Sequence, residues 1–252
     1  MPGEPDFLNR QGYWHDWAAV HQRALVSAQR AGDPRGEARL HRGLGRAYAS
    51  LERPEESDAH LASALQLFTA LDDPAGLAHT YIDLSRNAER RRDYAHARES
   101  SQRAAECYAT VGKPAGEANA LNGVGWYSTL LGEHVRAVEC CEQALTLLRE
   151  LGDRSGQAAT MDSLGHAYLH LGDLERAEDH LCEAVRLFEE TGDPGEQAGS
   201  LTRLAEVHLA AGRIDTARTA LRQAASLYEA IGATTSLTRV RKQLDELDNP
   251  EP

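Results

Sequence analysis

The sequence is poor in the residues that build β-sheets and disulfide frameworks. Of its 252 residues only three are phenylalanine, nine are proline and four are cysteine. Segments rich in Ala, Leu, Glu and Arg favour helices, and few β-branched or aromatic runs favour strands. The cysteines show no CxxC spacing, and we expect them to be reduced packing residues. The composition therefore predicts an all-α protein.

Long apolar runs and an excess of positive charge are also missing. No segment is apolar over the length that spans a bilayer, and residues 1–12 contain no apolar signal-peptide core. The formal net charge of −12 argues against non-specific binding to nucleic acid or anionic membranes, because both require a net basic surface. We therefore expect a cytoplasmic protein that contacts neither a membrane nor nucleic acid directly.

Motifs of catalysis and cofactor binding are absent as well. The sequence contains no P-loop, HExxH or GxSxG, and Gly112-Lys113 is followed by Pro114 where a P-loop has Ser or Thr. Gly43-Leu44-Gly45 lacks the third glycine of a dinucleotide-binding loop. We therefore predict no cofactor, no bound metal and no enzymatic activity.

What the sequence does contain is a period of forty residues. The same loop position recurs without insertion at Gly32, Asp72, Gly112, Gly152, Gly192 and Gly232. Each unit holds two helical patterns and two turns, which indicates a helical solenoid rather than a globular enzyme domain. In the unit that starts at Gly152, the predicted helices run from about Gln157 to Leu171 and from about Leu174 to Glu190.

Fixed positions within each unit carry small or large apolar residues. The pattern is complete in the unit that contains Leu164, Gly165, Tyr168, Ala177, Leu181 and Ala184. It resembles the tetratricopeptide repeat (TPR) from about Gly32 to Glu229, in the lengthened forty-residue form. The opening from Trp14 to Trp17 is similar to the TPR arrays of actinobacterial antibiotic-regulatory and NB-ARC signalling proteins. The resemblance implies a right-handed TPR superhelix, an α-solenoid of antiparallel helix hairpins.

The period sets the expected domain boundaries. They are an N-terminal tail at 1–12, a half-repeat with only a second helix at 13–31, five TPRs at 32–71, 72–111, 112–151, 152–191 and 192–231, a capping helix at 232–248 and a tail at 249–252. In the second TPR Ala88 replaces the tyrosine and Arg92 replaces the turn glycine, which predicts a looser hairpin there.

In the resembled fold the first helices line a concave groove. The groove positions predict partner-binding residues at Arg39, Arg42, Arg46, His79, Arg86, Arg90, Asn119, Asn122, Trp126, Asp162, His166, His170, Arg203 and Glu206. The arginines offer planar donor forks that suit carboxylates or phosphates. We expect the two asparagines to bond a peptide backbone and Trp126 to anchor an apolar side chain.

These residues predict a protein-protein interaction module, a regulatory or scaffold TPR that binds a peptide or partner segment with acidic or carboxylate groups. Transcription regulation or signalling is the expected context, by resemblance alone. The other interpretation of the arginines is that they are solvated or paired surface side chains. The lysines with which carboxylate-clamp TPRs bind chaperone tails are missing, so we do not predict a cochaperone.

Two alternative functions stay open. Asp162, His166 and His170 share one helix face in the central groove near Trp126, which would suit a small-ligand-binding or enzymatic TPR protein. Asp162 and His170 stand about 12 Å apart along the helix, too far to share one metal. The other alternative is a self-associating scaffold, a homodimer formed through the N-terminal half-repeat. The remaining histidines, such as His60 and His180, are expected to be exposed.

Overall fold

The computed structural model describes residues 13–248, so both predicted tails lie outside the described residues. Within this range every regular element is an α-helix, which confirms the all-α class. The helices are α2 (Trp14–Ala31), α3 (Pro34–Ser50), α4 (Pro54–Ala70), α5 (Pro74–Arg90), α6 (Tyr94–Thr110), α7 (Pro114–Leu130), α8 (His134–Leu151), α9 (Arg154–Leu171), α10 (Leu174–Thr191), α11 (Pro194–Ala210), α12 (Ile214–Ala230) and α13 (Thr234–Asp248).

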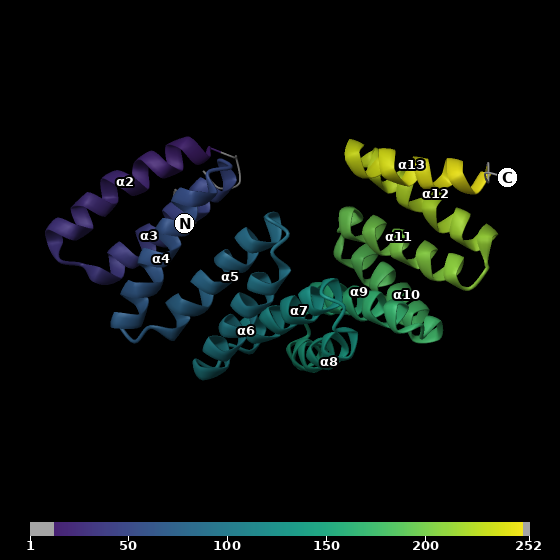
Figure 1. Ribbon diagram of the computed structural model, residues 1–252, viewed down its shortest axis with the longest axis horizontal. Helices are drawn as coiled ribbons and strands as arrows, with labels where there is room; N and C mark the ends of the chain where they lie inside the picture. The colour runs from purple at the N-terminus through teal and green to yellow at the C-terminus, as the bar shows by residue number, and fades with distance from the viewer. Residues whose placement is uncertain (1–12, 249–252) are drawn as a thin grey trace. The chain divides into compact units, whose positions relative to one another are not determined.

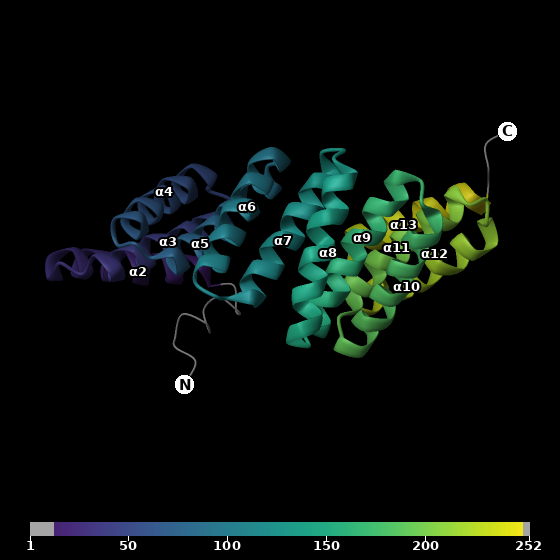
Figure 2. The ribbon, with the colours of Figure 1, turned by 90° about the horizontal axis from the view of Figure 1, so that it is seen from below.

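The chain forms two compact units, residues 1–120 and residues 121–252. In the first unit α3 pairs with α4 and α5 with α6, and α2 packs on α3 (Figure 1). In the second unit α9 pairs with α10 and α11 with α12, while α8 packs on α9 and α13 on α12 (Figure 2). Each unit is therefore a stack of antiparallel helix hairpins. None of the helices between residues 13 and 248 has the length and apolarity of a membrane span.

Aspartate side chains set where many of the helices begin. The Asp153 carboxylate accepts a hydrogen bond from the Gly156 amide at 2.9 Å, and Asp33 and Asp73 do the same for Gly36 and Gly76. Such a cap satisfies a first-turn amide that has no partner within the helix. The prediction that α9 begins near Gln157 was wrong for this reason, because Asp153 starts the helix at Arg154.

The turns between helices use the left-handed backbone region. Glycine occupies it at most turns, but Arg92 adopts it with φ of 58°. The Arg92 amide donates to the Glu89 carbonyl at 2.8 Å, and the Asp93 amide donates to the Ala88 carbonyl at 2.9 Å. The two helices that this turn connects, α5 and α6, are joined by Ser85, whose hydroxyl donates to the Ala97 carbonyl at 3.0 Å. The expected looseness of this hairpin was therefore wrong, since Arg92 accepts the strained conformation and the turn stays closed.

Small residues let the two helices of a hairpin approach closely. A Cβ atom added to Gly165 would stand 2.5 Å from Leu181 Cγ and 3.1 Å from the Ala177 carbonyl oxygen. Leu164, Leu181 and Phe188 fill the core of this hairpin. The recurring small position predicted from the sequence is thus a packing requirement.

Two histidines that were expected to be exposed are partly buried. The imidazole of His60 stacks on the Tyr48 ring with 5.4 Å between centroids, and His180 stacks on Tyr168 at 5.5 Å. In both cases the histidine lies on the second helix and the tyrosine on the first helix of the same hairpin. The rings therefore help to join the two helices.

Candidate partner-binding pockets

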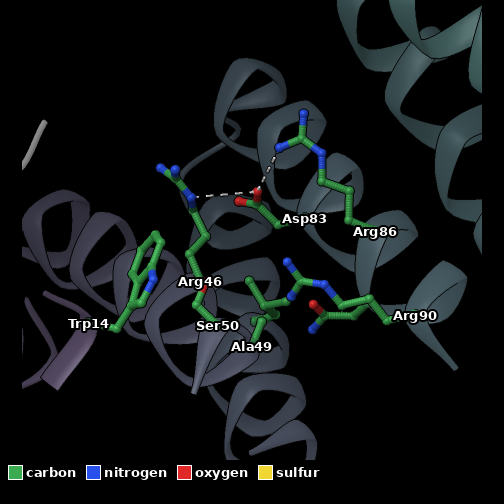
Figure 3. A pocket seen from close by; sticks show the side chains of 9 residues that line it. Trp14, Arg46, Ala49, Ser50, Asp83, Arg86 and Arg90 are labelled. Carbon is green, nitrogen blue, oxygen red and sulfur yellow. Dashed lines mark ion pairs between the residues drawn. The ribbon is translucent and has the colours of Figure 1, made fainter. Parts of the chain in front are cut away.

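A buried carboxylate organises the arginines of the first unit. Asp83 on α5 is only 5% exposed. Arg42 on α3 donates from Nε to Asp83 Oδ2 at 2.6 Å. Arg46 Nε and Arg86 Nη1 stand 3.9 Å and 4.0 Å from Asp83 Oδ1 (Figure 3). Three guanidinium groups around one carboxylate leave a surplus of two positive charges. We call these four residues the arginine cluster.

Two cavities share the ridge formed by Arg46, Asp83 and Arg86. One measures about 240 Å³ and is also lined by Trp14 and Arg90, with the Trp14 ring facing the arginines across it (Figure 3). The other measures about 260 Å³ and extends from Arg42 to Tyr108. The structure thus brings together four of the predicted groove arginines, Arg42, Arg46, Arg86 and Arg90.

His79, Tyr108 and Asn119 line the second of these cavities. The Tyr108 hydroxyl and His79 Nδ1 form a hydrogen bond of 2.7 Å. Burial lowers the pKa of His79, and the positive charges of Arg42 and Lys113 lower it further. His79 is therefore neutral near pH 7, and the positive charge of the site comes from the arginines. Sequence reasoning missed Tyr108, because it lies on a second helix.

The other groove candidates of the first unit are more isolated. Arg39 is exposed and lies outside the linings of the two cavities around the arginine cluster. Its neighbour three residues on, Arg42, is the one that reaches Asp83. One helical turn therefore decides which arginine joins the cluster.

In the second unit the structure corrects the placement of Asp162. This residue was expected to face the groove, but it is only 7% exposed. Its Oδ1 atom accepts hydrogen bonds from the Ser200 hydroxyl at 2.6 Å and from Arg203 Nη1 at 2.9 Å. Burial raises the pKa of Asp162, and Arg203 and Ser200 oppose that rise. Asp162 therefore positions Arg203 and is not accessible to a partner or a substrate.

The histidines beside it contact one another. His166 Nε2 and His170 Nε2 are 3.1 Å apart, and the His170 ring stacks on His134 with 5.0 Å between centroids. Burial, followed by the charge of Arg203, lowers the pKa of His166 to about 4. His166 is thus neutral near pH 7. Among residues 13–248 no three His, Cys, Asp or Glu side chains are placed to hold one metal ion.

Trp126 forms one wall of a pocket, and its indole ring already contacts other side chains of the protein. The Arg203 guanidinium lies 5.1 Å from the ring centroid and the His166 ring lies 5.2 Å away. Asn122, expected as a peptide contact, accepts a weak hydrogen bond from Cys141 Sγ at 3.7 Å. This bond uses one of the acceptor positions of the amide oxygen, and contact of Asn122 with a peptide stays a prediction.

The pocket of the second unit measures about 470 Å³. Four of the predicted residues line it, namely Trp126, His166, Arg203 and Glu206. Sequence reasoning missed others, which include Glu196, Tyr228, Ser236, Arg239 and Gln243. The last three lie on α13, which was expected only to cap the array. The signal was available, because α13 starts one repeat after α11 and presents the same positions.

Comparison with known proteins agrees with this architecture. Residues 116–190 match the tetratricopeptide repeat family. This part of the chain, which runs from α7 to α10, therefore contains tetratricopeptide repeats. A search of curated proteins found no match. Among solved structures the chain is similar to BtubC (BKLC) from P. vanneervenii, with 20% identity and a TM-score of 0.73 over 87% of this chain and 92% of that one.

Two further solved TPR structures have the same fold. A STAND protein with a TPR sensor, PH0952 from Pyrococcus horikoshii, shares 16% identity and a TM-score of 0.68 over 90% of this chain and 40% of its own. A Rap protein complexed with competence and sporulation factor shares 14% identity and a TM-score of 0.65 over 93% of this chain and 73% of its own. At these identities the likeness shows the fold.

Proposed function

We propose that this TPR protein is a regulatory interaction module whose first unit binds an anionic segment of a partner protein. The observation that carries the proposal is the arginine cluster, in which three guanidinium groups surround the buried carboxylate of Asp83 beside two cavities. A Rap protein of this fold forms a complex with competence and sporulation factor, and a STAND protein carries the repeat as a sensor. Both support a regulatory role.

Asp83 divides the arginines into two groups. Arg42 makes the short contact at 2.6 Å and is held by it. Arg46 and Arg86 stand about 4 Å from the carboxylate, so they keep donors free for a ligand. Arg86 is the most accessible of the three, with 64% of its side chain exposed. A carboxylate or phosphate that bridges Arg46 and Arg86 would receive charge-assisted hydrogen bonds from both.

The lining also favours a peptide over an isolated anion. Trp14 supplies an aromatic wall on one side of the ridge, and Asn119 supplies an amide on the other. An extended segment with an acidic residue at the ridge and an apolar residue toward Trp14 would use both. Aromatic side chains and arginines are the groups that most often carry binding energy at protein interfaces.

The test compares the chain with an Arg46→Gln/Arg86→Gln variant. Arg42 is left unchanged, because its loss would strand the buried Asp83 carboxylate and unfold the site. The matched control is Arg23→Gln/Arg103→Gln, which removes the same charge from two exposed positions on second helices. Each protein is used to select binders from a phage library of random dodecapeptides, and the affinities of selected peptides are measured by fluorescence polarisation.

The proposal predicts peptides enriched in Asp and Glu that bind the original chain and the control equally. Their affinity for the Arg46→Gln/Arg86→Gln variant should fall about tenfold, because two charge-assisted contacts are lost. Binding should also weaken with added salt. Equal affinity for all three proteins, or a selection without acidic enrichment, would exclude the arginine cluster as the binding site.

A further inference from the structure

The pocket of the second unit occupies the same repeat positions as the Tyr108 pocket of the first unit. Arg46, Asp83, Arg86, Tyr108 and Asn119 of the first pocket correspond, 120 residues later, to His166, Arg203, Glu206, Tyr228 and Arg239 of the second. An interval of 120 residues is three periods of the sequence. Each unit therefore has a pocket built by the same positions of three successive hairpins.

The charges at two of these five positions are reversed. Asp83 is replaced by Arg203, and Arg86 is replaced by Glu206. The buried ion pair is reversed too, since Arg42 on α3 reaches Asp83 on α5, whereas Asp162 on α9 holds Arg203 on α11. Asp162 thereby neutralises the positive charge of Arg203, just as Arg42 neutralises the negative charge of Asp83 in the first unit.

The balance of charge differs between the units in the same direction. Residues 1–120 contain 15 basic and 17 acidic side chains, a net charge of −2. Residues 121–252 contain 12 basic and 22 acidic side chains, a net charge of −10. The second unit therefore carries most of the negative charge of the protein and attracts cations.

A glycine opens the second pocket and frees a hydroxyl group. Gly199 stands where the first pocket has His79, and the cavity grows from about 260 Å³ to about 470 Å³. Tyr228 is only 6% exposed, and its hydroxyl lies 3.8 Å from the point that a Cβ of Gly199 would occupy. Tyr108 bonds His79, but Tyr228 has no hydrogen-bond partner among residues 13–248. The Tyr228 hydroxyl, which can donate and accept, thus faces the cavity without a partner in the described part of the chain.

We propose that this pocket binds a basic segment of a partner protein, through lysine or arginine side chains that pair with Glu196 and Glu206. Neither carboxylate forms an ion pair within the described part of the chain, and both line the pocket. The site contains three carboxylates, including that of the buried Asp162, and two guanidinium groups, those of Arg203 and Arg239. Its net charge is therefore −1 when His166 is neutral. This site uses other residues than the arginine cluster, so the proposal does not depend on the anion site.

The spacing of the carboxylates restricts the ligand. Glu196 and Glu206 are ten residues apart on α11, which places them about 15 Å apart along the helix axis. An extended peptide advances about 3.3 Å per residue, so basic residues four or five positions apart would reach both carboxylates. The Tyr228 hydroxyl lies beside Gly199, which stands between the two glutamates in the α11 sequence, and there it can bond the peptide backbone.

The experiment selects peptides from the same dodecapeptide library with the full chain and with a Glu196→Gln/Glu206→Gln variant. Glu150→Gln/Glu189→Gln is the matched control, because it makes the same charge change at exposed positions on the second helices of the same unit. A Gly199→His variant fills the cavity with the residue that the first pocket contains. Affinities are measured by fluorescence polarisation, and circular dichroism verifies that each variant is folded.

The expected result is a group of peptides with Lys or Arg four or five residues apart. Their affinity should fall about tenfold in Glu196→Gln/Glu206→Gln and in Gly199→His, and stay unchanged in the control and in Arg46→Gln/Arg86→Gln. Basic peptides that bind the double glutamine variant as tightly as the original chain would overturn the proposal. A selection with no enrichment of basic peptides would also overturn it. If acidic peptides bind every protein except Arg46→Gln/Arg86→Gln, the proposed anion site stands independently of this result.

Discussion

Acidification should destabilise the second unit through His166. Burial and Arg203, with His170 and His134 nearby, lower the pKa of this imidazole from 6.5 to about 4. Between these two pH values the unfolded chain binds a proton that the folded chain does not. Lowering the pH therefore favours unfolding, starting below about pH 6.5 and ending below about pH 4.

The magnitude follows from the pKa difference. Each pKa unit corresponds to about 1.36 kcal/mol, so the full effect is about 3 kcal/mol. Between about pH 7.5 and about pH 4.5, His166 alone should reduce the free energy of unfolding by about 2.5 kcal/mol. Above about pH 7 its contribution should not change.

The assay is urea unfolding followed by circular dichroism at both pH values, for the original chain and for His166→Asn. Asparagine does not titrate in this range, and the other acids and histidines contribute to both proteins alike. The original chain should lose about 2.5 kcal/mol more than the variant on acidification. Histidine NMR should place the titration of His166 near pH 4. The same pH dependence in both proteins would show that His166 is solvated, and it would refute the burial of His166 against His170 and Trp126.

Three further predictions concern local interactions. Asp83→Asn should lower the free energy of unfolding by about 2 kcal/mol, by removing the partner of Arg42, yet tighten binding of an acidic peptide, as urea unfolding and fluorescence polarisation would show. Arg92→Gly should raise the free energy of unfolding by about 1 kcal/mol, because glycine adopts positive φ without strain; a lower midpoint in urea would contradict this. Gly165→Ala should lower it by about 1 to 3 kcal/mol through overpacking against Leu181, and an unchanged midpoint would show that the helices separate easily.

The sequence by itself determined the local structure. The forty-residue period predicts the alternation of helices, and the small residue at Gly165 predicts close packing within the hairpin, because both depend on contacts between residues near in sequence. The sequence also contained the signal for the start of α9, because Asp153 is a favoured N-cap residue. The predicted start near Gln157 overlooked this signal.

Only the tertiary structure decided which side chains share a pocket. The period places Arg39 and Arg42 on one helix, but the offset between α3 and α5 decides that Arg42 meets Asp83. The same kind of offset buries Asp162 beneath Arg203 and leaves Tyr228 facing Gly199. These offsets arise from how side chains of neighbouring hairpins interlock across many contacts. A repeat period shows which positions recur, but not which of their side chains meet.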